Sequence, residues 1–186
     1  FIIAFFGFTV VANAFGYNLV QQIITWGEEN FNLSIVREVN ETNSSSDSFN
    51  SDSTSVTYDD IDKAFENIDP KPLLPKWVPD GLAFKFAEKF TMTNYTNILL
   101  YYEDEDKSLI FDYVIYGENF KADRLSYEKD ATPIRIFEKN DIKHYIMKNL
   151  DKVQVVWTNS NVIYSITGDI SMDEVEKILE LMYGGV

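Results

Sequence analysis

The most regular pattern in the chain is an alternation of apolar and polar residues within residues 82–167, which predicts β-strands. Short polar stretches interrupt this alternation, and connections that short force the strands on either side to run antiparallel. Three hairpins are therefore expected. They pair 98–102 with 109–116, 133–138 with 142–149, and 153–157 with 162–167, with turns at 103–106, 139–141 and 159–160.

The clearest helix signal lies near the C-terminal end. Ser171 is followed three residues later by Glu174, and this spacing is a capping box that begins a helix. Apolar residues then recur at helical spacing until Gly184 ends the pattern. This apolar stripe is expected to lie across one face of the sheet. It consists of Val175, Ile178, Leu179 and Met182.

Residues 17–31 are interpreted as a second, N-terminal helix. Asn18 can cap it, Gln21 is placed to complete a capping box, and the apolar side chains fall near one face. Tyr17 and Trp26 have amphipathic rings that suit a membrane interface, so a position on lipid and a position on the domain are both open. The predicted fold class is α+β, a meander-like antiparallel sheet with a C-terminal helix and an N-terminal helix packed on it.

The first residues form an apolar run without charge. Within residues 1–12 only Thr9 is polar, whereas a complete membrane-spanning helix needs about 20 apolar residues. Three interpretations stay open: the outer half of a span, a signal segment cleaved after Ala12-Asn13-Ala14, or a buried core helix. The first two place the main domain outside the cell, and the first makes the chain a single-pass protein of the cell membrane.

Composition divides the chain into four parts. Residues 1–16 are assigned to the partial transmembrane or signal segment, and residues 17–39 to an amphipathic juxtamembrane helix. Residues 40–57 are rich in Ser and Asp and contain no Lys or Arg, so they cannot bury enough apolar surface to become ordered and are assigned to a linker. Residues 58–186 are assigned to the extracytoplasmic α+β domain.

The beginning of that domain is expected to be mostly irregular. Residues 59–68 predict one short helix that Asp59 or Asp60 can cap. Four prolines then follow within residues 70–79 and exclude regular structure. Asp80-Gly81 predicts a tight turn just before the sheet begins.

Net charge narrows the choice of partners. The 186 residues include 30 acidic and 16 basic side chains, which gives a formal net charge of −14. No segment offers the basic patch that a phosphate backbone requires, so no nucleic-acid partner is expected. The same charge disfavours adsorption to anionic lipid headgroups. The absence of cysteine removes disulfides, thiolate nucleophiles and Cys-ligated zinc.

Candidate chemistry is sparse. His144 is the one histidine in the sequence, and its place within a strand favours a cross-strand surface residue over a catalytic base. The acidic run 103–106 invites a calcium site, but it lacks the alternating ligands and central glycine of an EF-hand loop, so a solvated hairpin turn is favoured. Phosphate-binding and hydrolase motifs are also missing, so no catalytic residue, no cofactor and no metal site is expected.

Strand 109–116 is apolar on both faces, and Asp112 alone interrupts it. A sheet with one wet face shows a cleaner alternation than this. The second face is therefore expected to be covered by residues 17–31, by a partner or by an apolar ligand. We favour coverage by the protein's own elements.

Several motifs together resemble a known bacterial family. They are Leu74, Pro75, Trp77, Pro79 and Gly81 in a Leu-Pro-x-Trp-x-Pro-x-Gly signature; the stretch 140–147 with Asn149, Val156 and Trp157; the stretch 164–171; and, near the start, residues 10–31. This set, which covers most of residues 70–183, resembles the domain of unknown function numbered 4367, found mainly in Firmicutes. The resemblance implies a cytoplasmic N-terminal part, one membrane span and this domain outside. It also implies that Trp77 and Trp157 are core aromatics and that Pro79 and Gly81 form a turn.

Three hypotheses for function follow. The first is a non-catalytic sensing or binding domain of a membrane-tethered regulator, similar to the anti-sigma factors that some family members resemble. It would take an envelope peptide, a protein or an apolar ligand. The alternatives are a lipid or apolar-ligand carrier domain and a carboxylate-dependent envelope hydrolase.

Overall fold

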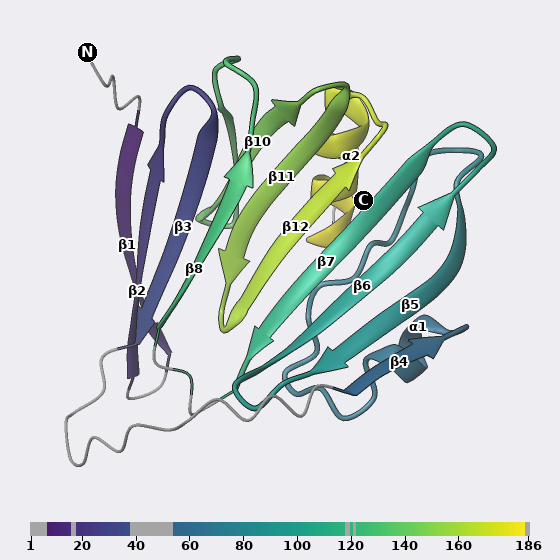
Figure 1. Ribbon diagram of the computed structural model, residues 1–186, viewed down its shortest axis with the longest axis horizontal. Coiled ribbons are helices and arrows are strands. Elements are labelled where there is room, and N and C mark those ends of the chain that lie inside the picture. Colours follow the sequence, from purple (N-terminus) through teal and green to yellow (C-terminus); the bar gives the residue numbers. More distant parts are fainter. Residues whose placement is uncertain (1–6, 16–17, 38–53, 118–119, 121, 185–186) are drawn as a thin grey trace.

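The computed structural model describes residues 7–15, 18–37, 54–117, 120 and 122–184. The described strands lie in two antiparallel sheets, and two helices accompany them (Figure 1). The elements are β1 (Gly7–Phe15), β2 (Asn18–Trp26), β3 (Asn30–Arg37), β4 (Thr54–Tyr58), α1 (Ile61–Ala64), β5 (Ala83–Thr91), β6 (Tyr95–Glu103), β7 (Ser108–Tyr116), β8 (Ala122–Glu128), β9 (Arg135–Lys139), β10 (Ile142–Asn149), β11 (Lys152–Asn159), β12 (Val162–Gly168) and α2 (Met172–Met182).

The chain passes three times between the two sheets, from β3 to β4, from β7 to β8 and from β8 to β9. The small sheet has the order β1-β2-β3-β8, and the large sheet has the order β4-β5-β6-β7-β12-β11-β10-β9. After β7 the chain leaves the large sheet, adds β8 beside β3, and then returns to build β9 to β12. The small sheet therefore joins strands that lie far apart in the sequence.

The three predicted hairpins are confirmed in the large sheet. They are β6 with β7, β9 with β10, and β11 with β12, and each pair is antiparallel. The two-residue turn between β9 and β10 places Asn140 and Asp141 at φ values of 51° and 61°. Asparagine and aspartate tolerate this left-handed backbone better than other residues with a side chain, so the local sequence accounts for the turn.

The predicted C-terminal helix is also confirmed, with its capping box intact. The Ser171 hydroxyl accepts from the Glu174 backbone N–H, the Glu174 carboxylate accepts from the Ser171 backbone N–H, and Gly184 has a φ of 85° beyond the helix end. The predicted stripe of α2 is buried against the large sheet. The helix predicted over residues 59–68 is a single short turn, α1, whose N-cap is Asp60.

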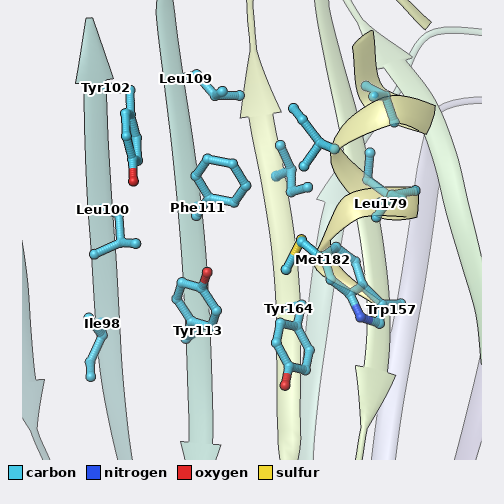
Figure 2. Close-up of a cluster of buried hydrophobic side chains, with 14 of the residues drawn as sticks. Ile98, Leu100, Tyr102, Leu109, Phe111, Tyr113, Trp157, Tyr164, Leu179 and Met182 are labelled. Atoms are coloured by element: carbon cyan, nitrogen blue, oxygen red, sulfur yellow. The ribbon is translucent and has the colours of Figure 1, made fainter. Parts of the chain in front are cut away.

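One face of the large sheet packs on α1, α2 and the proline-rich segment. Figure 2 shows the side chains of β6 and β7 in rows, beside Trp157 and Tyr164 and the helix residues Leu179 and Met182. The rings of Trp157 and Tyr164 stack with centroids 4.8 Å apart. The Tyr164 hydroxyl also accepts from the backbone N–H of Leu73, which fastens the proline-rich segment to the sheet.

The two expected core aromatics and the turn of the Leu-Pro-x-Trp-x-Pro-x-Gly motif have structural roles. Trp157 is buried in the core, whereas Trp77 is only partly buried and carries the Lys177 ammonium 3.8 Å above its ring. Gly81 has a φ of 94°, and the backbone N–H of Leu82 donates to the carbonyl of Pro79 to close the turn. A positive φ of this kind favours glycine.

The small sheet covers the opposite face of the large sheet. Its buried residues meet a second apolar surface that belongs mainly to β10, β11 and β12. The cluster consists of Ile24, Phe31, Leu33, Ile35, Tyr116, Phe120, Tyr145, Met147, Val156 and Ile163. The large sheet is therefore buried on both faces around β10 to β12, as a middle layer between α2 and the small sheet.

The helix predicted over residues 17–31 is wrong, because residues 18–26 form β2 and residues 30–37 form β3. From Phe31 to Ile35 buried and partly exposed residues alternate with a period of two, and this alternation is the strand pattern. The Gly27-Glu28-Glu29 segment supplies a turn, in which the backbone N–H of Gly27 donates to the carbonyl of Asn30. The buried ammonium of Lys129 donates to the Glu28 carbonyl at 2.8 Å and so stabilises that turn.

The other N-terminal expectations fare differently along the chain. Residues 1–6 and 16 of the expected membrane segment lie outside the described residues, and residues 7–15 form β1 where a helix was expected. Most of the expected linker also lies outside the described residues, but its end forms β4, paired with β5. Within the described part of the chain, neither helix has the length and apolarity needed to cross a bilayer.

The close approach of β12 to β7 gives a test of this packing. A Cβ atom on Gly168 would lie 2.6 Å from the Ser108 carbonyl oxygen and 3.0 Å from the Leu109 Cα, so the backbone would have to shift. We expect Gly168→Ala to lower the free energy of unfolding by about 1–3 kcal/mol, measured by urea denaturation. Gly27→Ala is the matched control, because nothing lies within 4 Å of its added methyl. Equal effects of the two substitutions would contradict this account.

Candidate functional site

His144 is completely buried, with 0% of its surface exposed. Its imidazole lies among three aromatic rings, and the centroid of Trp157 is 5.0 Å away. The prediction of a surface residue is therefore wrong. Alternation along one strand assigns His144 and Tyr145 to opposite faces, but both faces of β10 are covered, one by α2 and one by the small sheet.

The hydrogen bonds of His144 determine its tautomer. Nδ1 lies 3.1 Å from the carbonyl oxygen of Phe137, which can only accept, so Nδ1 carries the proton. Nε2 lies 2.9 Å from the Tyr183 hydroxyl and accepts from it. Burial lowers the pKa of His144 from 6.5 to about 4, so the ring is neutral at neutral pH.

This arrangement makes His144 a structural link. Both ring nitrogens are engaged, and neither partner is a nucleophile placed next to a free base. The link runs from the end of α2, at Tyr183, to β9 and β10. An ion pair between Lys139 and Glu180 joins the same helix to β9. Histidine here stabilises the fold, and no catalytic role follows from its surroundings.

A pH titration tests the His144 link. The unfolded chain takes up a proton near pH 6.5 and the folded chain only near pH 4, so stability falls as the pH drops through that window. The loss is about 3 kcal/mol when the shift is converted to free energy. His144→Gln removes this loss, so the stability difference between wild type and variant is expected to shrink by that amount in acid. Chemical denaturation at several pH values measures it, with the exposed neighbour Lys143→Gln as the control. Parallel pH profiles for wild type and His144→Gln would contradict the assignment.

The acidic run 103–106 is a hairpin turn between β6 and β7, as predicted. The Asp104 carboxylate accepts from the backbone N–H groups of Asp106 at 2.8 Å and Lys107 at 2.7 Å. These bonds lower the pKa of Asp104, and the side chain is exposed. Among the residues that the structure describes, no three His, Asp or Glu side chains are grouped as metal ligands would be.

A second feature lies on β5, β6 and β7, on the face opposite α1. Several large apolar side chains there are partly exposed and belong to neither of the two buried clusters. Figure 1 shows β5 to β7 on the right, with β10 to β12 between them and the small sheet. We call this surface the open face. It consists of the apolar residues Phe86, Phe90, Leu99, Tyr101 and Ile110 and the carboxylates Glu88 and Asp112.

Strand register places the two carboxylates in one row across the open face. Glu88 is opposite Leu99, and Leu99 is opposite Asp112. In the next row Phe86 is opposite Tyr101, and their rings stack with centroids 4.4 Å apart. Carboxylates and aromatic rings are thus interleaved on a surface three strands wide.

Asp112 is held by neutral groups. The Asn97 amide donates to its Oδ1 atom, and Ser165 on β12 is a second hydrogen-bond partner. Burial raises the pKa of Asp112 to about 6, and these two bonds act in the opposite direction. Glu88 likewise accepts from the Tyr101 hydroxyl at 3.0 Å.

Neither carboxylate has a cationic partner among the described residues. The ion pairs found in that part of the chain join other acids to Lys and Arg. No cation contributes to the pKa of Asp112. A largely buried carboxylate usually has such a partner, because desolvation of an unpaired charge is unfavourable. The open face therefore carries uncompensated negative charge.

The sequence predicted part of this arrangement, namely the cover on the second face of β7. Strand 109–116 was expected to be covered on its second face, and Val114 and Tyr116 are indeed packed against the small sheet. Ile110 and Asp112, on the same face, are not part of that cluster. Asp112 was noted only as an interruption of an apolar strand, which was the available signal, and its neighbours could not be inferred without the sheet order.

The desolvation of Asp112 gives a prediction about stability. A folded-state pKa of about 6, above the unfolded value of 3.8, means that the ionised carboxyl disfavours folding above pH 6. We expect Asp112→Asn to raise the free energy of unfolding by about 1–3 kcal/mol near neutral pH, and the gain to vanish as the pH falls below about 4. Urea denaturation measures it, with the exposed Glu105→Gln as control. A less stable Asp112→Asn protein at neutral pH would refute the prediction.

Comparison with known proteins gives one match. The family model described as Domain of unknown function (DUF4367) matches residues 72–182, from the proline-rich segment to the end of α2. No curated protein and no solved structure matches the chain.

Proposed function

This chain belongs to the family Domain of unknown function (DUF4367), and from that premise we propose that it is a non-catalytic binding domain that takes a polypeptide partner on its open face. The observation that carries the proposal is the set of large apolar side chains on β5 to β7 that no buried cluster includes. Contiguous apolar surface of this kind, with polar groups among it, is typical of interaction sites.

The chemistry of the open face favours a polypeptide over a lipid. Asp112 lies beside the central Leu99, on the β7 side of the surface, and is ionised at neutral pH, since its pKa is about 6. A hydrocarbon chain laid across it would remove the remaining water without supplying a hydrogen-bond donor, which increases the desolvation cost. A polypeptide can cover Leu99 and Ile110 with apolar groups and offer donors to the carboxylates.

The proposal includes the setting of the domain. We propose that it belongs to a membrane-tethered regulator, similar to an anti-sigma factor, and faces the outside of the cell. The membrane anchoring that the family resemblance implies supports this placement, and residues 1–6 carry no charge. Because residues 7–15 are a paired strand, any bilayer-embedded helix has to lie before Gly7. Occupancy of the open face would then be the signal that the tethered protein reports.

A displayed peptide library tests the proposed function. The full chain is panned against random peptides of about twelve residues, long enough to cross several strands. We expect enriched peptides whose binding shifts the amide NMR signals of β5, β6 and β7, and whose affinity falls about tenfold in Leu99→Ser.

The control is Val56→Ser on edge strand β4. Val56 is 47% exposed and pairs with Lys89, whose side chain points to the opposite side of the sheet, toward the Glu66 carbonyl. This substitution is expected to leave binding unchanged. Enriched peptides that bind Leu99→Ser as tightly as the wild type, or a library without enrichment, would refute the proposed function.

A further inference from the structure

The charge of the open face points to a particular class of partner, provided that the proposed function is correct. Glu88 and Asp112 are the acidic residues of its central row, and their hydrogen-bond partners are Tyr101, Asn97 and Ser165, all neutral. A further acid, Asp123 on β8, accepts from the Tyr116 hydroxyl at 2.6 Å. Burial raises the pKa of Tyr127, and Asp112 and Asp123 together raise it further. The chain as a whole carries a net charge of −14, so the long-range field has the same sign as the site.

We propose that the open face binds an extended basic polypeptide segment, in which Lys or Arg side chains alternate with apolar residues. The basic groups reach Glu88 and Asp112, and the apolar residues cover Leu99 and Ile110. The partner's cationic groups supply the counter-charge that the face lacks among its own residues.

The aromatic rings strengthen this match. Phe86 and Tyr101 are stacked beside the carboxylate row, and Phe90 flanks it on the other side. The apolar stem of a Lys or Arg side chain can pack on such a ring while its charged head reaches the neighbouring carboxylate. The charged head then lowers the cost of keeping Asp112 ionised, a cost that is visible in its raised pKa.

Other occupants fit this charge less well. A second copy of the chain would bring another net charge of −14 toward the same carboxylates. An anionic lipid surface would be repelled in the same way. The net negative charge of the chain attracts a basic polypeptide at long range, and the basic side chains neutralise the two carboxylates at contact. The apolar side chains of the polypeptide cover the apolar part of the surface.

Three synthetic peptides of equal length and equal aromatic content test the inference: one rich in lysine, one uncharged and one rich in glutamate. Affinities for the full chain are measured by calorimetry at low and high salt. We expect the lysine-rich peptide to bind at least about tenfold more tightly than the uncharged one, with an advantage that shrinks as salt rises.

Conservative variants test whether the two carboxylates bind the lysine-rich peptide. Asp112→Asn and Glu88→Gln keep the shape of the face and are each expected to weaken the lysine-rich peptide about three- to tenfold, with little effect on the uncharged one. Glu105→Gln, in the exposed turn between β6 and β7, removes one negative charge elsewhere and is the matched control. It is expected to leave the affinity for the lysine-rich peptide unchanged.

The outcomes separate this inference from the proposed function. Equal binding of the lysine-rich and uncharged peptides, unaffected by Asp112→Asn, would overturn the basic partner and leave an apolar docking face. Tightest binding of the glutamate-rich peptide would overturn the inference in the same way. If no peptide binds, both proposals fail; self-association in sedimentation, abolished by Leu99→Ser, would then assign the face to a second copy.

Discussion

The structure depends on one constraint: the strands β10, β11 and β12 are apolar on both faces, so the large sheet has to be covered twice. On one side α2 and the proline-rich segment bury Trp157 and its neighbours. On the other side the small sheet buries Tyr145, Met147 and Ile163. Burial of apolar surface on this scale is the dominant favourable contribution to folding, so the two coverings are required for stability. The first covering continues over β5 to β7, whereas the small sheet ends on β7 between Val114 and Asp112. The open face is the part of the second side that the small sheet does not reach.

The C-terminal half of the fold could be predicted because its signals are local. A two-residue turn such as Asn140-Asp141, or a capping box such as Ser171 with Glu174, specifies its own conformation within a few residues. The N-terminal strands lack such signals. Apolar residues at 19, 20, 23 and 24 have helical spacing and lack strand alternation, and pairing with β1 and β3 overrides this local pattern. The alternation from Phe31 to Ile35 was the evidence that a strand was present.

The candidate site was predictable only in outline, because its character depends on long-range order. The sequence indicated that strand 109–116 needs a cover on its second face. It could not indicate that the cover stops between Val114 and Asp112, since that follows from the order β7-β12-β11 and from the reach of the small sheet. His144 is a second example, because it was expected to be exposed and is buried. Alternation along one strand gives the side on which a residue lies, but it does not reveal whether that side is wet.

The excursion of the chain to β8 in the small sheet determines which layers the matched segment can build by itself. The matched residues 72–182 include β8 but exclude the partner strand β3, as well as β1, β2 and β4. A chain that had only the matched segment would have an unpaired β8, and its apolar surface at Tyr145, Met147 and Ile163 would be uncovered. In this chain the cover over that surface therefore comes from sequence outside the matched segment. The matched residues alone build two layers, and the N-terminal strands add the third.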